Sequence, residues 1–96
     1  MFDIVTFGSA VVDVFVDSDE YDKGRKSFVF RSGKKILVND MKEDIGGGAI
    51  NSSVGFSRMG FKVGCICKIG TDSDGESIRK LLRSERVSPH SRQHRF

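Results

Sequence analysis

The chain has 96 residues and a mass of 10.7 kDa, so it forms one small domain at most, with a modest hydrophobic core. Hydrophobic residues make up 38% of it, and no apolar stretch approaches the roughly 18 residues that a membrane-spanning helix needs. The net charge of +3 is uneven, since residues 1–75 hold ten Lys and Arg against eleven Asp and Glu, whereas residues 76–96 hold six against two. This basic segment has no interleaved aromatic residues and no nucleic-acid motif. We therefore expect neither a membrane nor a nucleic-acid partner.

The two cysteines, Cys65 and Cys67, stand two positions apart in an apolar run, so on a strand their side chains share one face. No second cysteine pair completes a metal site, and His90 and His94 lie far along the chain. We predict reduced thiols in a hydrophobic core and no bound metal. The N-terminus enters an apolar run without the basic region of a secretory signal, which indicates a cytoplasmic protein.

The first third of the chain predicts extended structure. Residues 2–16 are rich in Val, Ile and Phe around Gly8 and Ser9, which predicts a buried strand, a tight turn and a second extended stretch. The acidic residues 17–22 lack the spacing of a calcium-binding loop and are expected to form a solvated loop. Residues 27–38 then predict an antiparallel β-hairpin that turns at Ser32-Gly33.

Glycines punctuate the second half. The triplet Gly46-Gly47-Gly48 introduces a helix predicted over residues 49–59, and Gly60 is placed to end it with a left-handed C-terminal cap. Thr71 and Asp74 have the spacing of a capping box, with Asp in place of the usual Glu or Gln. The helix that follows has an apolar stripe made of Ile78, Leu81 and Leu82.

The order of these elements is typical of an α/β fold. Residues 61–69 read as a further buried strand, so strand, strand, hairpin, helix, strand and helix follow one another. This order predicts a mostly parallel sheet with the hairpin as an appendage. After Leu82 the apolar pattern decays, and two helices leave at least one face of such a sheet uncovered. We expect the fold to be incomplete.

Three features suggest a binding site, and each has a structural alternative. A glycine triplet at a helix start lets a ligand approach the backbone and leaves N–H groups free to donate, but a short triplet is more often a flexible turn. Asn51, in the first turn of the helix, either caps backbone N–H groups or reaches a polar ligand. Asp13 stands in an apolar run, where it either meets a ligand hydroxyl or shares a solvated strand face with Asp17.

Together these residues resemble the PfkB (ribokinase-like) carbohydrate kinases. The first signature of that family is matched by Gly46, Gly47, Ala49, Asn51, Ser53, Gly60 and Gly70, with Gly70-x-Asp72-x-x-Gly75 extending it. The opening run from Gly8 to Asp13 looks like the first-strand motif of the family, whose aspartate binds the sugar. The resemblance covers residues 3 to about 88.

The resemblance implies a ribokinase-like α/β fold in which residues 1–88 are the substrate-side part. Within them, residues 20–43 would be the small β lid over the sugar, and residues 89–96 an unrelated or disordered tail. By the same resemblance, the residues that contact the hydroxyls of a sugar or nucleoside are Asp13, Gly46, Gly47 and Asn51. The chain departs from the family at Val11, where ribokinase has a polar Asn, and this departure leaves the identity of the sugar open.

The catalytic end of the family pattern is absent from the sequence. Full-length members use ATP and Mg²⁺ and carry a Gly-Ala-Gly-Asp type motif that supplies the anion hole and the catalytic base, and no G-x-G-D string occurs here. We therefore predict a truncated sugar kinase that is inactive alone, has no catalytic residue and binds no cofactor. The alternative is a non-catalytic fragment that binds a polyol or a protein partner. The predicted hairpin is marginal alone and offers a route to a homodimer.

Overall fold

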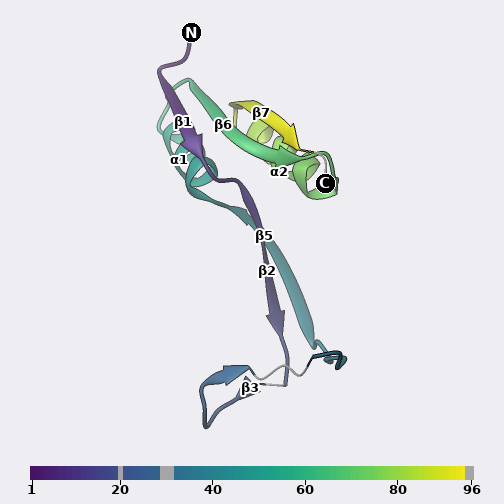
Figure 1. The fold of residues 1–96 in the computed structure, drawn as a ribbon. Coiled ribbons are helices and arrows are strands. Elements are labelled where there is room, and N and C mark those ends of the chain that lie inside the picture. The colour runs from purple at the N-terminus through teal and green to yellow at the C-terminus, as the bar shows by residue number, and fades with distance from the viewer. Residues whose placement is uncertain (20, 29–31, 95–96) are drawn as a thin grey trace. The chain divides into compact units, whose positions relative to one another are not determined.

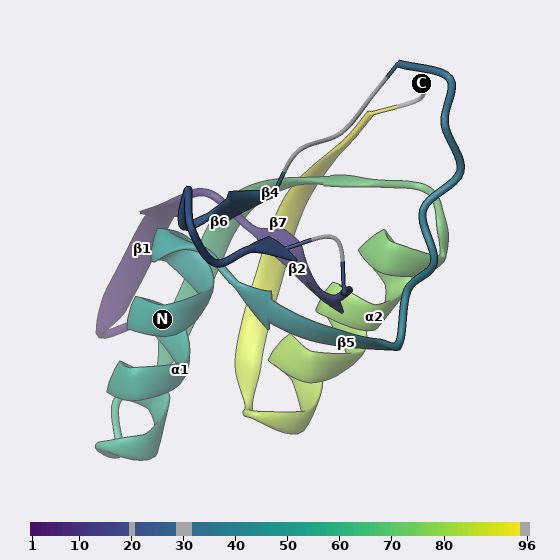
Figure 2. The same cartoon turned by 90° about the horizontal axis from the view of Figure 1, so that it is seen from below.

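The computed structural model describes residues 1–19, 21–28 and 32–94. The chain divides into two compact units, Met1–Asp13 with Ile45–Phe96 and Val14–Asp44, and each is described by itself. Figure 1 and Figure 2 together label the elements. In chain order they are β1 (Ile4–Gly8), β2 (Val11–Asp17), β3 (Tyr21–Asp22), β4 (Ser27–Phe28), β5 (Asp40–Gly46), α1 (Gly48–Arg58), β6 (Val63–Gly70), α2 (Ser73–Ser84) and β7 (Val87–His94). In the described chain, α1 and α2, with 11 and 12 residues, fall short of the length and apolarity of a membrane-spanning helix.

The first unit is built on a parallel sheet, as the sequence predicts. Its strand order is β1-β6-β7, and both pairings are parallel. Thr6 of β1 lies opposite Cys65 of β6, which lies opposite Pro89 of β7. The two helices provide the crossovers between these strands, which is the usual way to connect parallel neighbours.

One face of this sheet and the two helices enclose the core (Figure 2). Because side chains alternate along a strand, β6 turns every second residue toward the helices. The buried core residues are Ala49 and Ile50 from α1, Val63, Cys65, Cys67 and Ile69 from β6, Ile78 and Leu82 from α2, and Val87 from β7. Both cysteines are free and buried, so the prediction that they lie in the hydrophobic core is confirmed.

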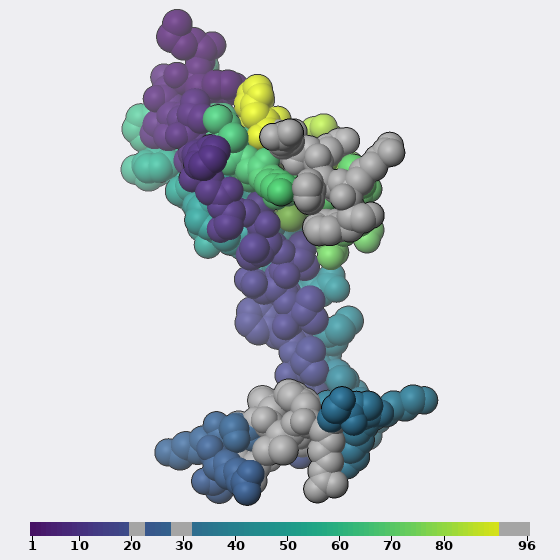
Figure 3. All heavy atoms as spheres, viewed as in Figure 1, coloured from purple at the N-terminus to yellow at the C-terminus, as the bar shows by residue number. Residues whose placement is uncertain are grey.

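The opposite face of the sheet, which we call the outer face, has no helix on it among the described residues. Val5 is 52% exposed, Phe7 84% and Ile66 40%. The ring of Phe2 lies over Gly64, where a Cβ would come within 3.0 Å of it. Strand β1, in purple, lies at the surface in the space-filling view (Figure 3). Parallel sheets are normally covered on both faces, whereas this apolar outer face is uncovered among the described residues.

Helix α1 ends as the sequence predicts. Gly60 has a φ of +98°, the left-handed conformation that glycine adopts without a Cβ clash. Its N–H donates to the carbonyl of Ser57, and that of Phe61 donates to the carbonyl of Phe56. The rings of Phe56 and Phe61 meet edge to face at 6.2 Å. These bonds and the apolar contact form a Schellman motif, which turns the chain toward β6.

The start of α2 differs from the predicted capping box. The N-terminal cap is Asp72, whose carboxylate accepts a hydrogen bond of 3.0 Å from the N–H of Gly75. Thr71 and Asp74 therefore do not form the box. Asp at this position satisfies one of the free N–H groups of the first turn in the same way.

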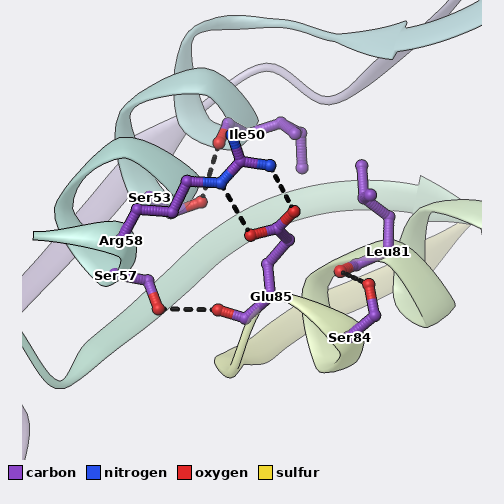
Figure 4. A network of polar contacts seen from close by, with 7 residues as sticks. All are labelled: Ile50, Ser53, Ser57, Arg58, Leu81, Ser84 and Glu85. Atoms are coloured by element: carbon purple, nitrogen blue, oxygen red, sulfur yellow. Dashed lines mark hydrogen bonds and ion pairs between the residues drawn. The ribbon is translucent and has the colours of Figure 1, made fainter. Parts of the chain in front are cut away.

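The far ends of the two helices are joined by a polar network (Figure 4). The Arg58 guanidinium donates to the Glu85 carboxylate from Nε at 2.9 Å and from Nη2 at 2.5 Å. The Ser57 hydroxyl donates to the Glu85 carbonyl. Glu85 follows α2 directly, so this network ties the C-terminal end of one helix to that of the other.

The second unit contains a small antiparallel hairpin, but not at the predicted place. Strands β3 and β4 pair antiparallel, with Tyr21 opposite Phe28, around a turn formed by residues 23–26. Residues 35–38, which were expected to be the second strand, form no strand, and residues 29–31 lie outside the described ones. The Ser18 hydroxyl donates to the carbonyl of Leu37 at 2.9 Å, so this coil is held by the end of β2 rather than by the predicted hairpin.

The C-terminal segment also differs from expectation. Residues 89–94, predicted to be an unrelated or disordered tail, continue β7, which pairs in parallel with β6 over its full length. Residues 95–96 lie outside the described part. The expectation of an unrelated or disordered tail therefore does not hold for residues 89–94. Their mixed polar and apolar composition shows no strand pattern in the sequence.

Candidate functional site

The turn that links β5 to α1 is held by a residue from another turn. Ser9 lies between β1 and β2, and its hydroxyl accepts a hydrogen bond of 3.1 Å from the N–H of Gly48. Its carbonyl accepts a second bond of 3.1 Å from the N–H of Ala49. The serine therefore caps α1 from the end of β1, although the residue at the cap position, Gly47, has no side chain.

Gly47 is required at this position for two reasons. Its φ of +103° is one that side-chain-bearing residues rarely adopt. A Cβ there would also stand 2.5 Å from the carbonyl oxygen of Ser9. The second glycine of the triplet thus lets the two turns pack backbone against backbone.

The sequence led us to expect free N–H groups at the start of α1. In the structure, those of Gly48 and Ala49 are already bonded to Ser9, so the turn does not offer them to a ligand. Ser9 is the residue of this site that the sequence analysis missed. The signal for it was weak, because a serine beside a glycine in a strand-to-strand turn is common.

Asp13 lies beside the first glycine of the triplet. A Cβ on Gly46 would come within 3.2 Å of Oδ2 of Asp13, so the missing side chain gives the carboxylate its place. Asp13 itself is exposed, and it forms no hydrogen bond or ion pair within the described part of the chain. Strand β2 is exposed over most of its length, so the apolar run around Asp13 does not bury the carboxylate.

Asn51 stands one helical turn beyond the triplet. Its N–H donates to the carbonyl of Gly47 at 2.9 Å. Its side chain is exposed and caps no backbone group among the described residues. The capping alternative for this asparagine is therefore not what the structure has.

The four predicted site residues are thus linked in space by short steps. The Asp13 carboxylate lies beside the place of a Cβ on Gly46, Gly46 precedes Gly47, and Gly47 accepts the backbone hydrogen bond of Asn51. All four belong to the first unit, and the start of α1 is bonded to Ser9 at the carboxyl end of β1. In open α/β folds ligands bind at this edge of the sheet.

A hollow of about 420 Å³ lies elsewhere in this unit. Its walls include Phe2, Phe61, Lys62 and Arg86, which stand at the amino ends of the strands. We assign the candidate site to the glycine turn instead. The exposed side chains of Asp13 and Asn51 and the close backbone packing of Gly47 on Ser9 are found there. Open α/β folds bind ligands at the carboxyl ends of their strands, which is the same edge.

A nucleotide would find little support among the described residues. The first N–H groups of α1 are taken by Ser9, and the N-terminus of α2 carries Asp72, Asp74 and Glu76, whose negative charges repel a phosphate. No cluster of three or more His, Cys, Asp or Glu in the described ranges is suited to hold a metal ion. These residues therefore do not fit ATP or Mg²⁺.

This parallel sheet with its two crossovers and its glycine turn defines a ribokinase-like α/β unit. A carbohydrate kinase from Agrobacterium tumefaciens superposes with a TM-score of 0.74 at 24% identity, covering 99% of this chain and 28% of that chain. A ribokinase from Cryptococcus neoformans var. grubii serotype A, solved in complex with ADP, superposes with a TM-score of 0.71 at 22% identity, covering 92% of this chain and 26% of that one. These structures share the fold.

The family is established by the sequence itself. The profile of the pfkB family of carbohydrate kinases matches residues 1–94, and the chain belongs to that family. A 5-dehydro-2-deoxygluconokinase from Listeria monocytogenes serotype 4a (strain HCC23) is 30% identical over 82 residues, which are 85% of this chain and 22% of the relative. The enzyme of that name from Listeria innocua serovar 6a is 29% identical over 87 residues, or 91% of this chain and 23% of the relative. The chain thus spans about a fifth of the length of these curated relatives.

Proposed function

We propose that this chain is the substrate-side part of a carbohydrate kinase that transfers the γ-phosphoryl group of ATP to a hydroxyl of a sugar or nucleoside. In this proposal Asp13, Gly46, Gly47 and Asn51 bind the hydroxyls of the substrate. The observation that carries it is the exposed Asp13 carboxylate, without a partner in the described chain, next to a glycine whose absent side chain leaves the carboxylate room. Membership of the pfkB family supports the reaction type.

The chemistry of these groups suits a polyol. A carboxylate accepts hydrogen bonds from hydroxyls, and such charge-assisted bonds are about twice as strong as neutral ones. The amide of Asn51 has both a donor and an acceptor for a second hydroxyl. In this proposal the backbone groups of Gly46 and Gly47 meet the substrate, while the space left by their absent side chains is taken by the Asp13 carboxylate and the Ser9 carbonyl. Together these groups orient a substrate without supplying a base.

The same proposal makes the 96 residues inactive by themselves. Phosphoryl transfer requires groups that hold the phosphates and a base that accepts the proton of the attacking hydroxyl. The described residues do not fit ATP or Mg²⁺, so those groups would have to come from other residues of a complete kinase domain. The purified chain is expected to give no ATP-dependent product with hexoses, ribose or nucleosides. Turnover that disappears in Asp13→Ala would contradict this.

A titration of the ¹⁵N-labelled chain with ribose, glucose and adenosine tests the substrate site. Asp13→Ala should weaken binding about ten- to a hundred-fold, since a hydrogen bond to a charged group contributes roughly 1.5–3 kcal/mol. Asp17→Ala is the matched control, because Asp17 is an exposed aspartate four residues later on the same strand. Equal losses in the two variants, or no binding to the unmodified chain, would overturn the proposal.

Partner binding is the second candidate function, and the apolar outer face favours it. Val5, Phe7 and Ile66 expose a surface that a covering polypeptide would bury. We also propose that the segment of residues 20–43 acts as a lid and that two copies of the chain form a homodimer through it. A cytoplasmic location is a separate prediction. Sedimentation of the chain between 10 and 500 µM measures self-association, and a strict monomer would remove the dimer.

A further inference from the structure

A single serine organises the glycine turn. Ser9 accepts the N–H of Gly48 on its hydroxyl and the N–H of Ala49 on its carbonyl, each at 3.1 Å. Its carbonyl also forms the surface on which Gly47 rests, since a Cβ on that glycine would stand 2.5 Å away. Ser9 thus meets three consecutive residues of the turn, although 38 positions separate it from Gly47.

This arrangement addresses a weakness of the triplet. Glycine loses more conformational freedom on ordering than any other residue, so three in succession are costly to hold in one conformation. A ligand that had to order them would bind more weakly. Contacts that fix the turn before the ligand arrives remove that cost.

We propose that Ser9 is a positioning residue of the substrate site, which fixes the turn of Gly46 to Gly48 opposite the Asp13 carboxylate. This inference rests on the proposed function, since it concerns the same site. Ser9 does not bind the substrate in this account. It acts through Gly47, whose carbonyl is bonded to the N–H of Asn51, and through the start of α1.

The same contacts define which part of a substrate faces the turn. A helix start attracts anions through its free N–H groups, but Ser9 occupies those of Gly48 and Ala49. The carboxylate of Asp13 beside Gly46 adds a negative charge that repels an anion. The group that meets the turn is therefore an uncharged hydroxyl of the substrate and not a phosphate or a carboxylate.

Three serine variants of the full chain test the proposal by ¹⁵N NMR titration with ribose and glucose. Ser9→Ala should raise the Kd about five-fold, because the bond to the N–H of Gly48 is lost while the fold remains. Ser9→Thr keeps the hydroxyl and should restore the Kd to within two-fold of the unmodified chain. Ser77→Ala is the matched control, since its hydroxyl bonds to the carbonyl of Ser73 at 3.0 Å within α2 and not to the turn. It should leave the Kd unchanged.

Two further readouts separate positioning from folding. Hydrogen exchange of the Gly48 amide should accelerate in Ser9→Ala, while the exchange of the β6 amides stays the same. If Ser9→Ala is unfolded, Ser9→Cys replaces it, because a thiol is a poor acceptor on the same Cβ. Inorganic phosphate at 10 mM should not shift the amides of Gly48 or Ala49 in the unmodified chain.

The outcomes are distinguishable. If the unmodified chain binds neither sugar, the proposed function fails and this inference fails with it. If it binds and Ser9→Ala binds equally well, only the positioning role is overturned. A loss in Ser77→Ala as large as in Ser9→Ala would show general loosening of the chain and would also overturn it. Phosphate shifts at Gly48 would overturn the uncharged ligand group.

Discussion

The carboxylate of Asp13 lies against Gly46, at 3.2 Å from the position that a Cβ on that glycine would occupy. The contact joins the start of β2 to the end of β5, two strands that pair with each other. A side chain on residue 46 would displace the carboxylate, because the atom nearest to it is the end of the flexible Asp13 side chain and not a backbone atom. The glycine therefore determines where the negative charge of the site stands.

Gly46→Ala should consequently affect binding more than stability. The backbone at Gly46 has no positive φ, so alanine is tolerated there, and the carboxylate moves by a few tenths of an ångström. We expect sugar affinity to fall several-fold, with a change in the free energy of unfolding below about 1 kcal/mol. Gly55→Ala, at a helix position where a Cβ meets nothing within 4 Å, should leave affinity unchanged. Urea unfolding and the sugar titration measure both quantities, and a large loss of stability in Gly46→Ala would contradict the argument.

Gly47→Ala should behave in the opposite way. Its φ of +103° and the 2.5 Å approach to the Ser9 carbonyl force the backbone of one turn to move. We expect a loss of roughly 2–4 kcal/mol, since an unfavourable backbone conformation costs of order 1–3 kcal/mol and the clash adds to it. Gly48→Ala is the control, because a Cβ at Gly48 meets nothing within 4 Å and its φ is not positive. Similar unfolding midpoints for the two variants would show that the packing on Ser9 is unimportant.

Local patterns in the sequence predicted the first unit well. Gly60 ends α1 and Cys65 and Cys67 share a buried face, because a cap and an alternating strand depend on neighbouring residues. Ser9 could not be found in this way. Its role depends on a contact with residues 38 to 40 positions away, and no periodicity records such a contact.

The sequence analysis did not predict strands β5 and β7, and the reason differs from that for Ser9. Strand β5 has the sequence DMKEDIG and is largely exposed, so it has no apolar alternation to detect. Strand β7 contains Pro89, which lacks an N–H and is tolerated on an edge strand. The order β1-β6-β7 places β7 at an edge of the described sheet. The predicted hairpin was wrong in place because alternating Phe and Val residues indicate extended chain without indicating the partner strand.

The ion pair between Arg58 and Glu85 should make stability depend on pH. The hydrogen bond from Arg58 lowers the pKa of the Glu85 carboxyl. Because the pKa is depressed in the folded state, the contribution is present above the unfolded value near 4.3 and is lost as the pH falls through the folded value. The unfolding midpoint of the unmodified chain should fall more steeply below pH 5 than that of Glu85→Gln. The Arg58 side chain is exposed and that of Glu85 is half-buried, so salt screens the pair in part and the difference should shrink in 0.5 M NaCl. Parallel curves would contradict the prediction.

The outer face should control self-association without contributing to the fold. Phe7 is 84% exposed on β1, so Phe7→Lys removes apolar surface that is not packed in the described chain. We expect an unchanged unfolding midpoint and less association at high concentration. Met59→Lys, at a position 71% exposed near the end of α1, is the matched control and should leave association as it is. Sedimentation at 10 to 500 µM makes the measurement, and equal effects of the two variants would remove the outer face as the cause.

Cys67 should be unreactive at neutral pH and should weaken the fold in alkali. Burial, followed by the neighbouring Cys65, raises the pKa of this thiol from 9.0 to about 11. Since the folded value is above the unfolded one, the contribution to stability is complete below about pH 9 and is lost as the pH rises toward 11. The free energy of unfolding should therefore fall more between pH 8 and 10.5 in the unmodified chain than in Cys67→Ala. The lysines contribute equally in both chains, so the difference between the two isolates the thiol. Iodoacetamide at pH 8 should label Cys67 only after urea is added, because the thiolate is the nucleophile. Rapid labelling of the folded chain at that pH would show that the thiol is neither buried nor protonated.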